Sequence, residues 1–176
     1  MRLVKQLIEI IYRKIHPIDY ARKKGVIIGS DCRINNTTYW GTEPWLIFIG
    51  NHVEISFEVA FITHDGATWV FREKERYRDV IKFGKIIIGD NCFIGARSTI
   101  LPGVTIGKNS IIAAGAVLTQ SVPEGQIWGG VPANYICNVN EYAEKCLKEN
   151  PQYDKSNYMK SKKEELLRVL DDGGIK

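Results

Sequence analysis

An aliphatic residue recurs at every sixth position through the second half of the chain. The uninterrupted series is Ile88, Ile94, Ile100, Ile106, Ile112 and Leu118. A period of six fits neither an α-helix, whose side chains repeat every ~3.6 residues, nor a simple strand with a period of two. It predicts a solenoid in which three six-residue segments form one triangular coil of about 18 residues, with each short strand stacked on the coil below.

The same spacing starts earlier, at Ile49, Ile55 and Phe61, after a first fragment at residues 28–34. Glycine often follows the aliphatic residue directly, as at Gly89 and Gly95, and would allow a left-handed backbone where the chain turns between two faces. We therefore expect an all-β solenoid, a parallel β-helix, over residues 26–136. An ordinary β-sandwich is the less favoured alternative, because nothing in it requires a strict six-residue register.

Two insertions interrupt the repeat. The first separates Ile34 from Ile49, and the second separates Phe61 from Ile86. Insertions in a solenoid form loops outside the coils, and loops held by a rigid scaffold often carry the chemistry. The second insertion, extruded at about residues 64–85, is either an exposed arm that packs on a neighbouring subunit or a lid over a substrate.

Both ends of the chain are predicted to be helical. Residues 1–17 carry an apolar stripe that ends at Pro17, which predicts a helix that caps the open end of the first coil. Peripheral contact of this helix with a membrane is the less favoured interpretation. The apolar stripe of residues 1–17 consists of Leu3, Val4, Leu7, Ile8, Ile11 and Ile15. At the other end, residues 139–176 are expected to form an amphipathic helical tail.

Composition narrows the class of function. The net charge of +4 suits an anionic co-substrate but is too small to indicate nucleic-acid binding. No stretch approaches the ~20 apolar residues of a membrane span, and no signal peptide is recognised, so a cytoplasmic location is expected. The four cysteines form no C-x-x-C pair, so no metal site is predicted, and Cys32 and Cys92 are expected to be small buried residues.

Four sequence blocks carry a family resemblance. They are residues 43–50 (EPWLIFIG), 61–66 (FITHDG), 88–95 (IGDNCFIG) and 129–133 (GGVPA). With them, residues 26–136 resemble the hexapeptide-repeat acyltransferases, in particular the sugar O-acetyltransferases that modify galactosides, maltose, nodulation factors and surface polysaccharides. The resemblance implies a left-handed coil, acetyl-CoA as co-substrate and a homotrimer with each active site between two subunits. It also implies acetyl transfer to a sugar hydroxyl of a glycan such as capsule or O-antigen.

Acetyl transfer from a thioester to a hydroxyl needs a general base, and imidazole is the natural choice near neutral pH. The chain has three histidines. His16 ends the first predicted helix and His52 occupies a turn, so both are expected to be ordinary surface residues. His64 alone opens an insertion, where the resemblance also places the catalytic histidine of the family. We expect His64 to be the catalytic base.

The resemblance assigns further roles by position. Asn36 and Glu43 are expected to bind the acceptor, with Asp65 as a third candidate beside the base. The coenzyme is expected to lie along the regular coils after residue 86, against Phe93, Ala96, Ala114 and Thr119. Where the family often has Lys or Arg after Pro-Ala, this chain has Asn134, which leaves other cations for the coenzyme phosphates: Lys85, Arg97 and Lys108.

Three alternative functions differ in their requirements. A zinc-dependent carbonic anhydrase on the same solenoid needs three convergent histidines, and only His64 is suitably placed. A non-catalytic scaffold would have lost its base, whereas this chain keeps the sequence T-H-D-G. An N-acetyltransferase acting on an amino-sugar nucleotide differs only in its acceptor, and the sequence leaves that alternative open.

Overall fold

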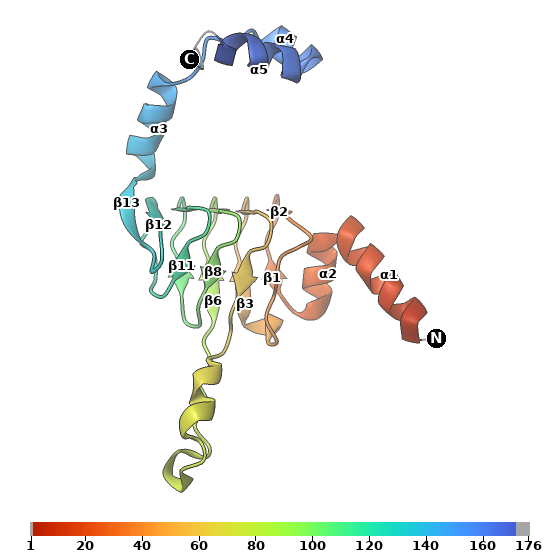
Figure 1. Cartoon of the computed structure of the whole chain (residues 1–176), viewed down its shortest axis with the longest axis vertical. Helices are drawn as coiled ribbons and strands as arrows, with labels where there is room; N and C mark the ends of the chain where they lie inside the picture. The colour runs from red at the N-terminus through yellow and green to blue at the C-terminus, as the bar shows by residue number, and fades with distance from the viewer. Residues whose placement is uncertain (1, 172–176) are drawn as a thin grey trace. The chain divides into compact units, whose positions relative to one another are not determined.

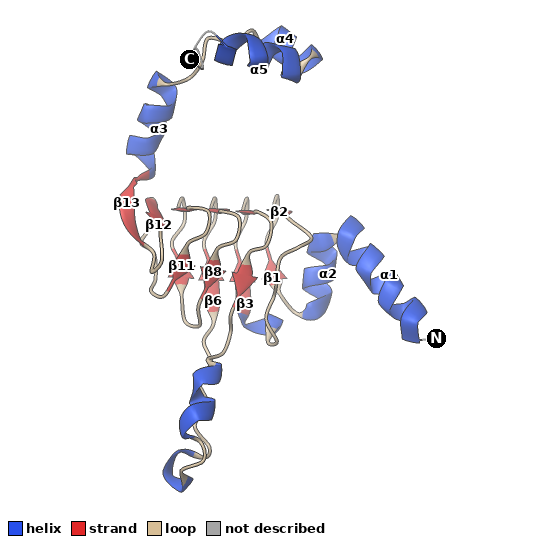
Figure 2. Ribbon diagram, in the orientation of Figure 1, coloured by secondary structure: helices blue, strands red, loops and turns tan. Residues whose placement is uncertain are grey.

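The computed structural model describes residues 2–171, and the chain divides into two compact units after Val139. The first unit holds helices α1 (Arg2–Ile15) and α2 (Pro17–Lys24) followed by stacked coils of parallel strands, as Figures 1 and 2 show. The coils confirm the predicted parallel β-helix. The left-handed sense that the resemblance implies stays a prediction.

The strands form three sheets, one for each face of the triangular coil. The first sheet contains β1 (Ile27–Ile28), β3 (Ile47–Ile49), β6 (Ile86–Ile88) and β9 (Thr105–Ile106). The second contains β2 (Arg33–Ile34), β4 (Glu54–Ile55), β7 (Phe93–Ile94), β10 (Ile111–Ile112), β12 (Gln126–Gly129) and the antiparallel β13 (Asn134–Asn138). The third contains β5 (Ala60–Phe61), β8 (Thr99–Ile100) and β11 (Val117–Leu118).

The six-residue repeat sets the register between coils. Ile94 pairs with Ile55 on one side and with Ile112 on the other, so aliphatic side chains of successive coils stack in a column. Ile94 and Ile112 are fully buried. Each such side chain contributes roughly 1.5–3 kcal/mol by leaving water. The recurring aliphatic residue is therefore the core of the solenoid.

The glycines after these aliphatic residues have a different role from the expected one. Gly89 and Gly95 do not adopt a left-handed backbone; that conformation belongs to residues two positions later, such as Asn91 (φ 55°) and Arg97 (φ 60°). A Cβ on Gly89 would lie 2.6 Å from the Lys108 nitrogen in the next coil, and a Cβ on Gly95 would lie 2.5 Å from the Ala114 nitrogen. Glycine is needed because the backbones of neighbouring coils approach too closely for any side chain.

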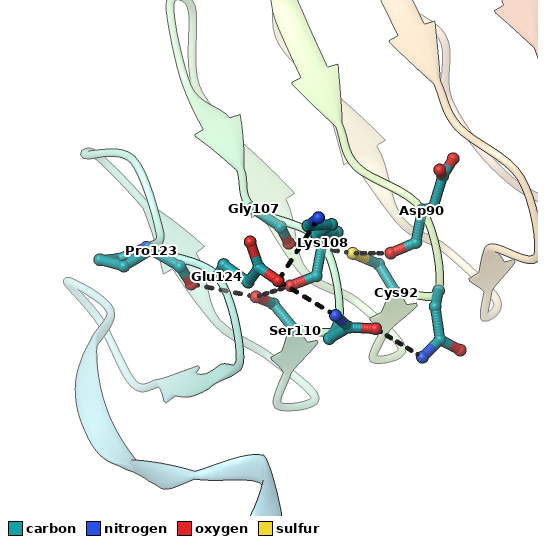
Figure 3. Close-up of polar contacts among 9 residues, drawn as sticks. Asp90, Cys92, Gly107, Lys108, Ser110, Pro123 and Glu124 are labelled. Carbon is teal, nitrogen blue, oxygen red and sulfur yellow. Dashed lines mark hydrogen bonds and ion pairs between the residues drawn. The ribbon is translucent and has the colours of Figure 1, made fainter.

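Small polar side chains bond the coils together at one corner (Figure 3). The Cys92 thiol donates to the Gly107 carbonyl at 3.2 Å, and the Ser110 hydroxyl donates to the Pro123 carbonyl at 3.1 Å. Cys92 is buried, and burial raises the pKa of its thiol, so it is a buried structural residue as expected. Cys32 is only half-buried and makes the matching bond to the Gly50 carbonyl.

The cap on the first coil is not the helix that the sequence indicated. The aliphatic side chains of α1 that the structure describes are exposed, at 58% for Leu7 and 60% for Ile8, whereas Ala21 of α2 is fully buried. Pro17 ends the first helix as expected, but it also starts the second, because proline fits the first turn of a helix. Helix α2 therefore makes the capping contact with β1 and β2. Within residues 2–171, no helix is long and apolar enough to cross a bilayer.

The second unit is helical, with α4 (Lys155–Lys160) and α5 (Lys162–Asp171), and α3 (Val139–Lys148) leads into it. Glu165 is its buried anchor, since the carboxylate accepts the Asp154 backbone N–H at 2.7 Å and pairs with Arg168. The Arg168 hydrogen bond lowers the pKa of Glu165 to about 2. Leu167 and Leu170, which lie in the amphipathic tail predicted for residues 139–176, are largely exposed.

Burial within a single strand predicts a contrast in stability. Ile88 is 2% exposed, whereas Ile87, its neighbour in β6, is 41% exposed. We expect Ile88→Ala to lower the free energy of unfolding by about 2–5 kcal/mol, because it leaves a cavity in the core. Ile87→Ala should cost much less. Urea denaturation followed by circular dichroism measures both, and equal losses would contradict the assignment of Ile88 to the core.

Candidate active site

Both insertions leave the solenoid at the same corner in successive coils. The first follows Tyr39, which bridges to Ala60 in the third sheet, and the second follows β5, which contains Ala60. Because parallel coils stack about 4.8 Å apart, loops from the same corner lie side by side. The second insertion extends beyond the coils as an arm with short helical turns at Gly66–Phe71 and Glu75–Tyr77 (Figure 1).

This arrangement brings Glu43 of the first insertion onto His64 of the second. The Nδ1 atom of His64 lies 3.0 Å from the Oε2 atom of Glu43. The Thr63 hydroxyl donates to the same carboxylate oxygen at 2.6 Å, and the Thr42 hydroxyl donates to the other at 2.7 Å. Both oxygens of Glu43 are thereby engaged, and the carboxylate is fixed in front of the imidazole.

The backbone also holds His64 in place. His64 forms an antiparallel bridge with Phe83, where the arm returns to the coils, and the two rings lie 5.6 Å apart. The His64 side chain remains 41% exposed, whereas that of Glu43 is 18% exposed. Phe83 and Glu43 therefore hold the imidazole in position, while part of its surface stays exposed.

The environment favours an ionised carboxylate at Glu43. Burial raises the pKa of Glu43, but hydrogen bonds from Thr63, Thr42 and His64 together outweigh burial and lower it below the usual range. A carboxylate at this distance accepts a hydrogen bond from the Nδ1–H group, and the ring then carries its free lone pair on Nε2. An imidazole in this tautomer can remove a proton from a hydroxyl group.

Asp65 has a structural role at the root of the arm. Its carboxylate pairs with Lys82 at 2.7 Å and accepts the Ala67 backbone N–H at 2.9 Å. The Lys82 hydrogen bond is the main reason that the pKa of Asp65 is lowered. Asp65 lines a pocket of about 260 Å³ together with His64, so an additional contact with the acceptor stays a prediction.

Asn36 is not joined to His64 within one chain. Its amide lies 3.5 Å from the Lys14 carbonyl of α1. Ile34, Ile55, Ile94 and Ile112 pair in register in the second sheet, so the residues two positions further along share the next corner. Asn36 therefore stands in line with Ala96 and Ala114, at a different corner from His64.

The four residues expected to bind the coenzyme do not all lie at the same corner of the coil. Ala96 and Ala114 lie one coil apart at the corner of Asn36, and Phe93 is 40% exposed on the adjoining sheet. Thr119 follows the third sheet, in register with the corner from which the His64 insertion leaves. A single chain thus does not bring these four residues into one line.

Sequence reasoning missed the two threonines that hold Glu43. Thr63 directly precedes His64, and Thr42 directly precedes Glu43, so their positions beside the two candidates were the available signal.

Among the residues that the structure describes, no three His, Cys, Asp or Glu side chains cluster closely enough to hold a metal ion.

Comparison with known proteins identifies the family. A family model described as the hexapeptide repeat of succinyl-transferase matches residues 85–120. Protein CapG of Staphylococcus aureus is 48% identical over 157 residues, which cover 88% of this chain and 89% of CapG. This chain belongs to the hexapeptide-repeat acetyltransferase family.

Other members are more distant. The galactoside O-acetyltransferase of Lactococcus lactis is 37% identical over 95 residues, which cover 54% of this chain and 44% of that enzyme. The solved serine acetyltransferase of Brucella abortus in complex with coenzyme A is 26% identical, with a TM-score of 0.51. That match covers 65% of this chain and 40% of the Brucella chain. This acetyltransferase thus shares its solenoid, rather than its whole length, with these two enzymes.

Proposed function

We propose that this hexapeptide-repeat acetyltransferase transfers the acetyl group of acetyl-CoA to a sugar hydroxyl, with His64 as general base. The observation that carries the proposal is the 3.0 Å contact between Nδ1 of His64 and Glu43, on an imidazole side chain that remains 41% exposed. Similarity to a galactoside O-acetyltransferase supports a sugar acceptor, and the family resemblance implies a surface glycan such as capsule or O-antigen.

In the proposed mechanism, acetyl-CoA supplies an acetyl group already activated as a thioester. His64 removes the acceptor proton through Nε2 while the acceptor oxygen attacks the carbonyl carbon. Glu43 stabilises the imidazolium that forms and keeps Nδ1 protonated. His64 then returns the proton to the departing sulfur as the C–S bond breaks. The sugar gains an acetyl ester, coenzyme A leaves as a thiol, and the base is regenerated.

The corner formed by Ala96 and Ala114 fits the pantetheine arm of the coenzyme. Its side chains are single methyl groups, and Ala114 is exposed, so a thin chain can approach the backbone of successive coils there. The Brucella relative, which binds coenzyme A, supports acetyl-CoA as the co-substrate. We keep Asn36 as a residue of this corner that contacts the acceptor.

A homotrimer explains why these residues occupy two corners. In a three-fold assembly of left-handed coils, the corner that carries Asn36, Ala96 and Ala114 in one subunit can face the His64 corner of the next. Each site is then completed by two chains, as the family resemblance implies. A single chain holds the base and the coenzyme corner apart.

The oligomeric state is directly measurable. We expect light scattering coupled to size exclusion to give three times the chain mass of 20.0 kDa at micromolar concentration. A stable monomer that transfers acetyl groups would overturn the shared site. A stable monomer without activity would still contradict the homotrimer.

The chemistry of the product distinguishes the O-acetyltransferase from its main alternative. Carbon-13-labelled acetyl-CoA is supplied with a panel of neutral sugars, amino sugars and sugar nucleotides, and the products are followed by NMR. The proposal predicts an acetyl ester that mild alkali removes. An amide that withstands alkali would favour N-acetylation of an amino-sugar nucleotide, and the absence of transfer to every acceptor would favour a scaffold.

A further inference from the structure

A second pocket adjoins the Glu43–His64 pair on the side of the N-terminal helices. It has a volume of about 440 Å³, within the range of roughly 300–1,000 Å³ typical of small-molecule sites. Its lining comes from α1, α2 and the first insertion: Arg13, Tyr20, Lys24, Thr38, Tyr39, Trp40, Gly41, Thr42, Pro44 and Trp45. We call it the helix-side pocket.

The helix-side pocket is connected to the catalytic pair by Thr42. The Thr42 hydroxyl donates to Glu43 and lies 3.2 Å from Nδ1 of His64. A molecule that fills the pocket therefore extends toward the catalytic pair. The regular coils expected to bind the coenzyme lie further along the solenoid, after residue 86, so the two substrates can approach the pair from different directions.

The charged side chains that line the helix-side pocket are all basic. Arg13 and Lys24 line it, and no carboxylate does. Lys24 is partly neutralised, since it forms an ion pair with Glu9 at 2.8 Å. Among the described residues, no ion pair involves Arg13, so its guanidinium remains available to an anionic ligand. Guanidinium groups bind phosphate oxygens in a bidentate manner.

The same pocket offers flat aromatic surfaces. Tyr39 is 52% exposed and Trp45 is 58% exposed, although both line the cavity. Trp40 is buried and stacks on Phe61 at 5.2 Å, which supports the wall from behind. Exposed aromatic rings beside the available guanidinium of Arg13 suit a ligand that combines an apolar ring face with a strongly charged group.

We propose that the helix-side pocket binds a diphosphate group attached to the acceptor sugar. The inference rests on the proposed function and specifies its substrate class: a sugar linked through a diphosphate to its carrier, rather than a free sugar. Arg13 and Lys24 contact the diphosphate, the aromatic wall contacts the sugar, and the target hydroxyl reaches His64 past Thr42. A nucleoside and a polyprenyl chain are the two carriers that share this chemistry.

Binding is measured without catalysis, so the test is independent of the proposed reaction. Isothermal titration calorimetry is run with uridine diphosphate and with farnesyl diphosphate, each on protein saturated with coenzyme A. We expect at least one probe to bind. Arg13→Ala should weaken that binding about tenfold, as expected for a hydrogen-bonded ion pair. The probe that binds more tightly identifies the carrier.

Lys14→Ala is the matched control. It removes the same charge from the next position of α1, but Lys14 does not line the pocket, so binding should change by less than about twofold. His64→Ala should bind the probe normally even though it is inactive, which separates this inference from the catalytic one. Three results would overturn the proposal: neither probe binds, the Arg13 and Lys14 variants lose the same amount of affinity for the probe, or a probe binds only to protein without coenzyme A.

Discussion

His64→Ala is expected to lower kcat by about 10²–10⁴-fold, the usual cost of losing a general base. Without the imidazole, the acceptor hydroxyl keeps its proton until it has attacked the thioester, and no group returns that proton to the departing sulfur. The affinity for coenzyme A should hardly change, because His64 is proposed to act on the acceptor proton, whereas the coenzyme is expected to be held along the coils at Ala96 and Ala114. Initial rates and calorimetry with coenzyme A measure the two quantities.

His52→Ala is the control for this variant. His52 is exposed, bonds to Asn91 at 2.8 Å and occupies the corner between the first and second sheets. Its loss should leave kcat close to that of the wild type. If His64→Ala retained near wild-type turnover in a properly folded trimer, His64 would not be the base.

Glu43→Gln is expected to be almost as damaging, with kcat reduced by roughly 10²-fold or more. The amide has nearly the same shape as the carboxylate, so Thr42 and Thr63 can keep their positions. However, an amide N–H facing Nδ1 donates a hydrogen bond to it, which places the ring proton on Nε2 and blocks the base. The KM for acetyl-CoA should stay nearly constant.

Glu54→Gln provides the matched exchange elsewhere on the solenoid, where Glu54 pairs with Arg33 on the exposed side of β4. That variant should retain its activity. A Glu43→Gln enzyme as active as the Glu54→Gln enzyme would mean that the carboxylate does not control the tautomer of His64.

The six-residue register was sufficient to predict the solenoid, because each aliphatic residue, such as Ile94, pairs with an equivalent residue in the next coil. It also located both insertions, since a break in the register must leave the coils. His64 was then the only histidine in an insertion. These features depend on local spacing, which a sequence displays directly.

The features of the fold and the site that the sequence did not predict depend on contacts between residues far apart in the chain. Glu43 and His64 are 21 positions apart, and their contact depends on two insertions leaving the same corner. Spacing could not distinguish a glycine required for a turn from one required by the close approach of the next coil, as at Gly89. The sequence does not predict helix α2 separately, because Pro17 can end the preceding helix as well as start a new one.

Glu43 and His64 are proposed to act as one catalytic unit, and a double-mutant cycle of kcat tests this directly. If Glu43 acts only through the imidazole, the Glu43→Gln/His64→Ala enzyme should be no slower than His64→Ala alone, within about twofold. Such a result is expected for residues that serve a single step. If the two losses multiplied instead, Glu43 would act independently of His64, and the proposed mechanism would be wrong.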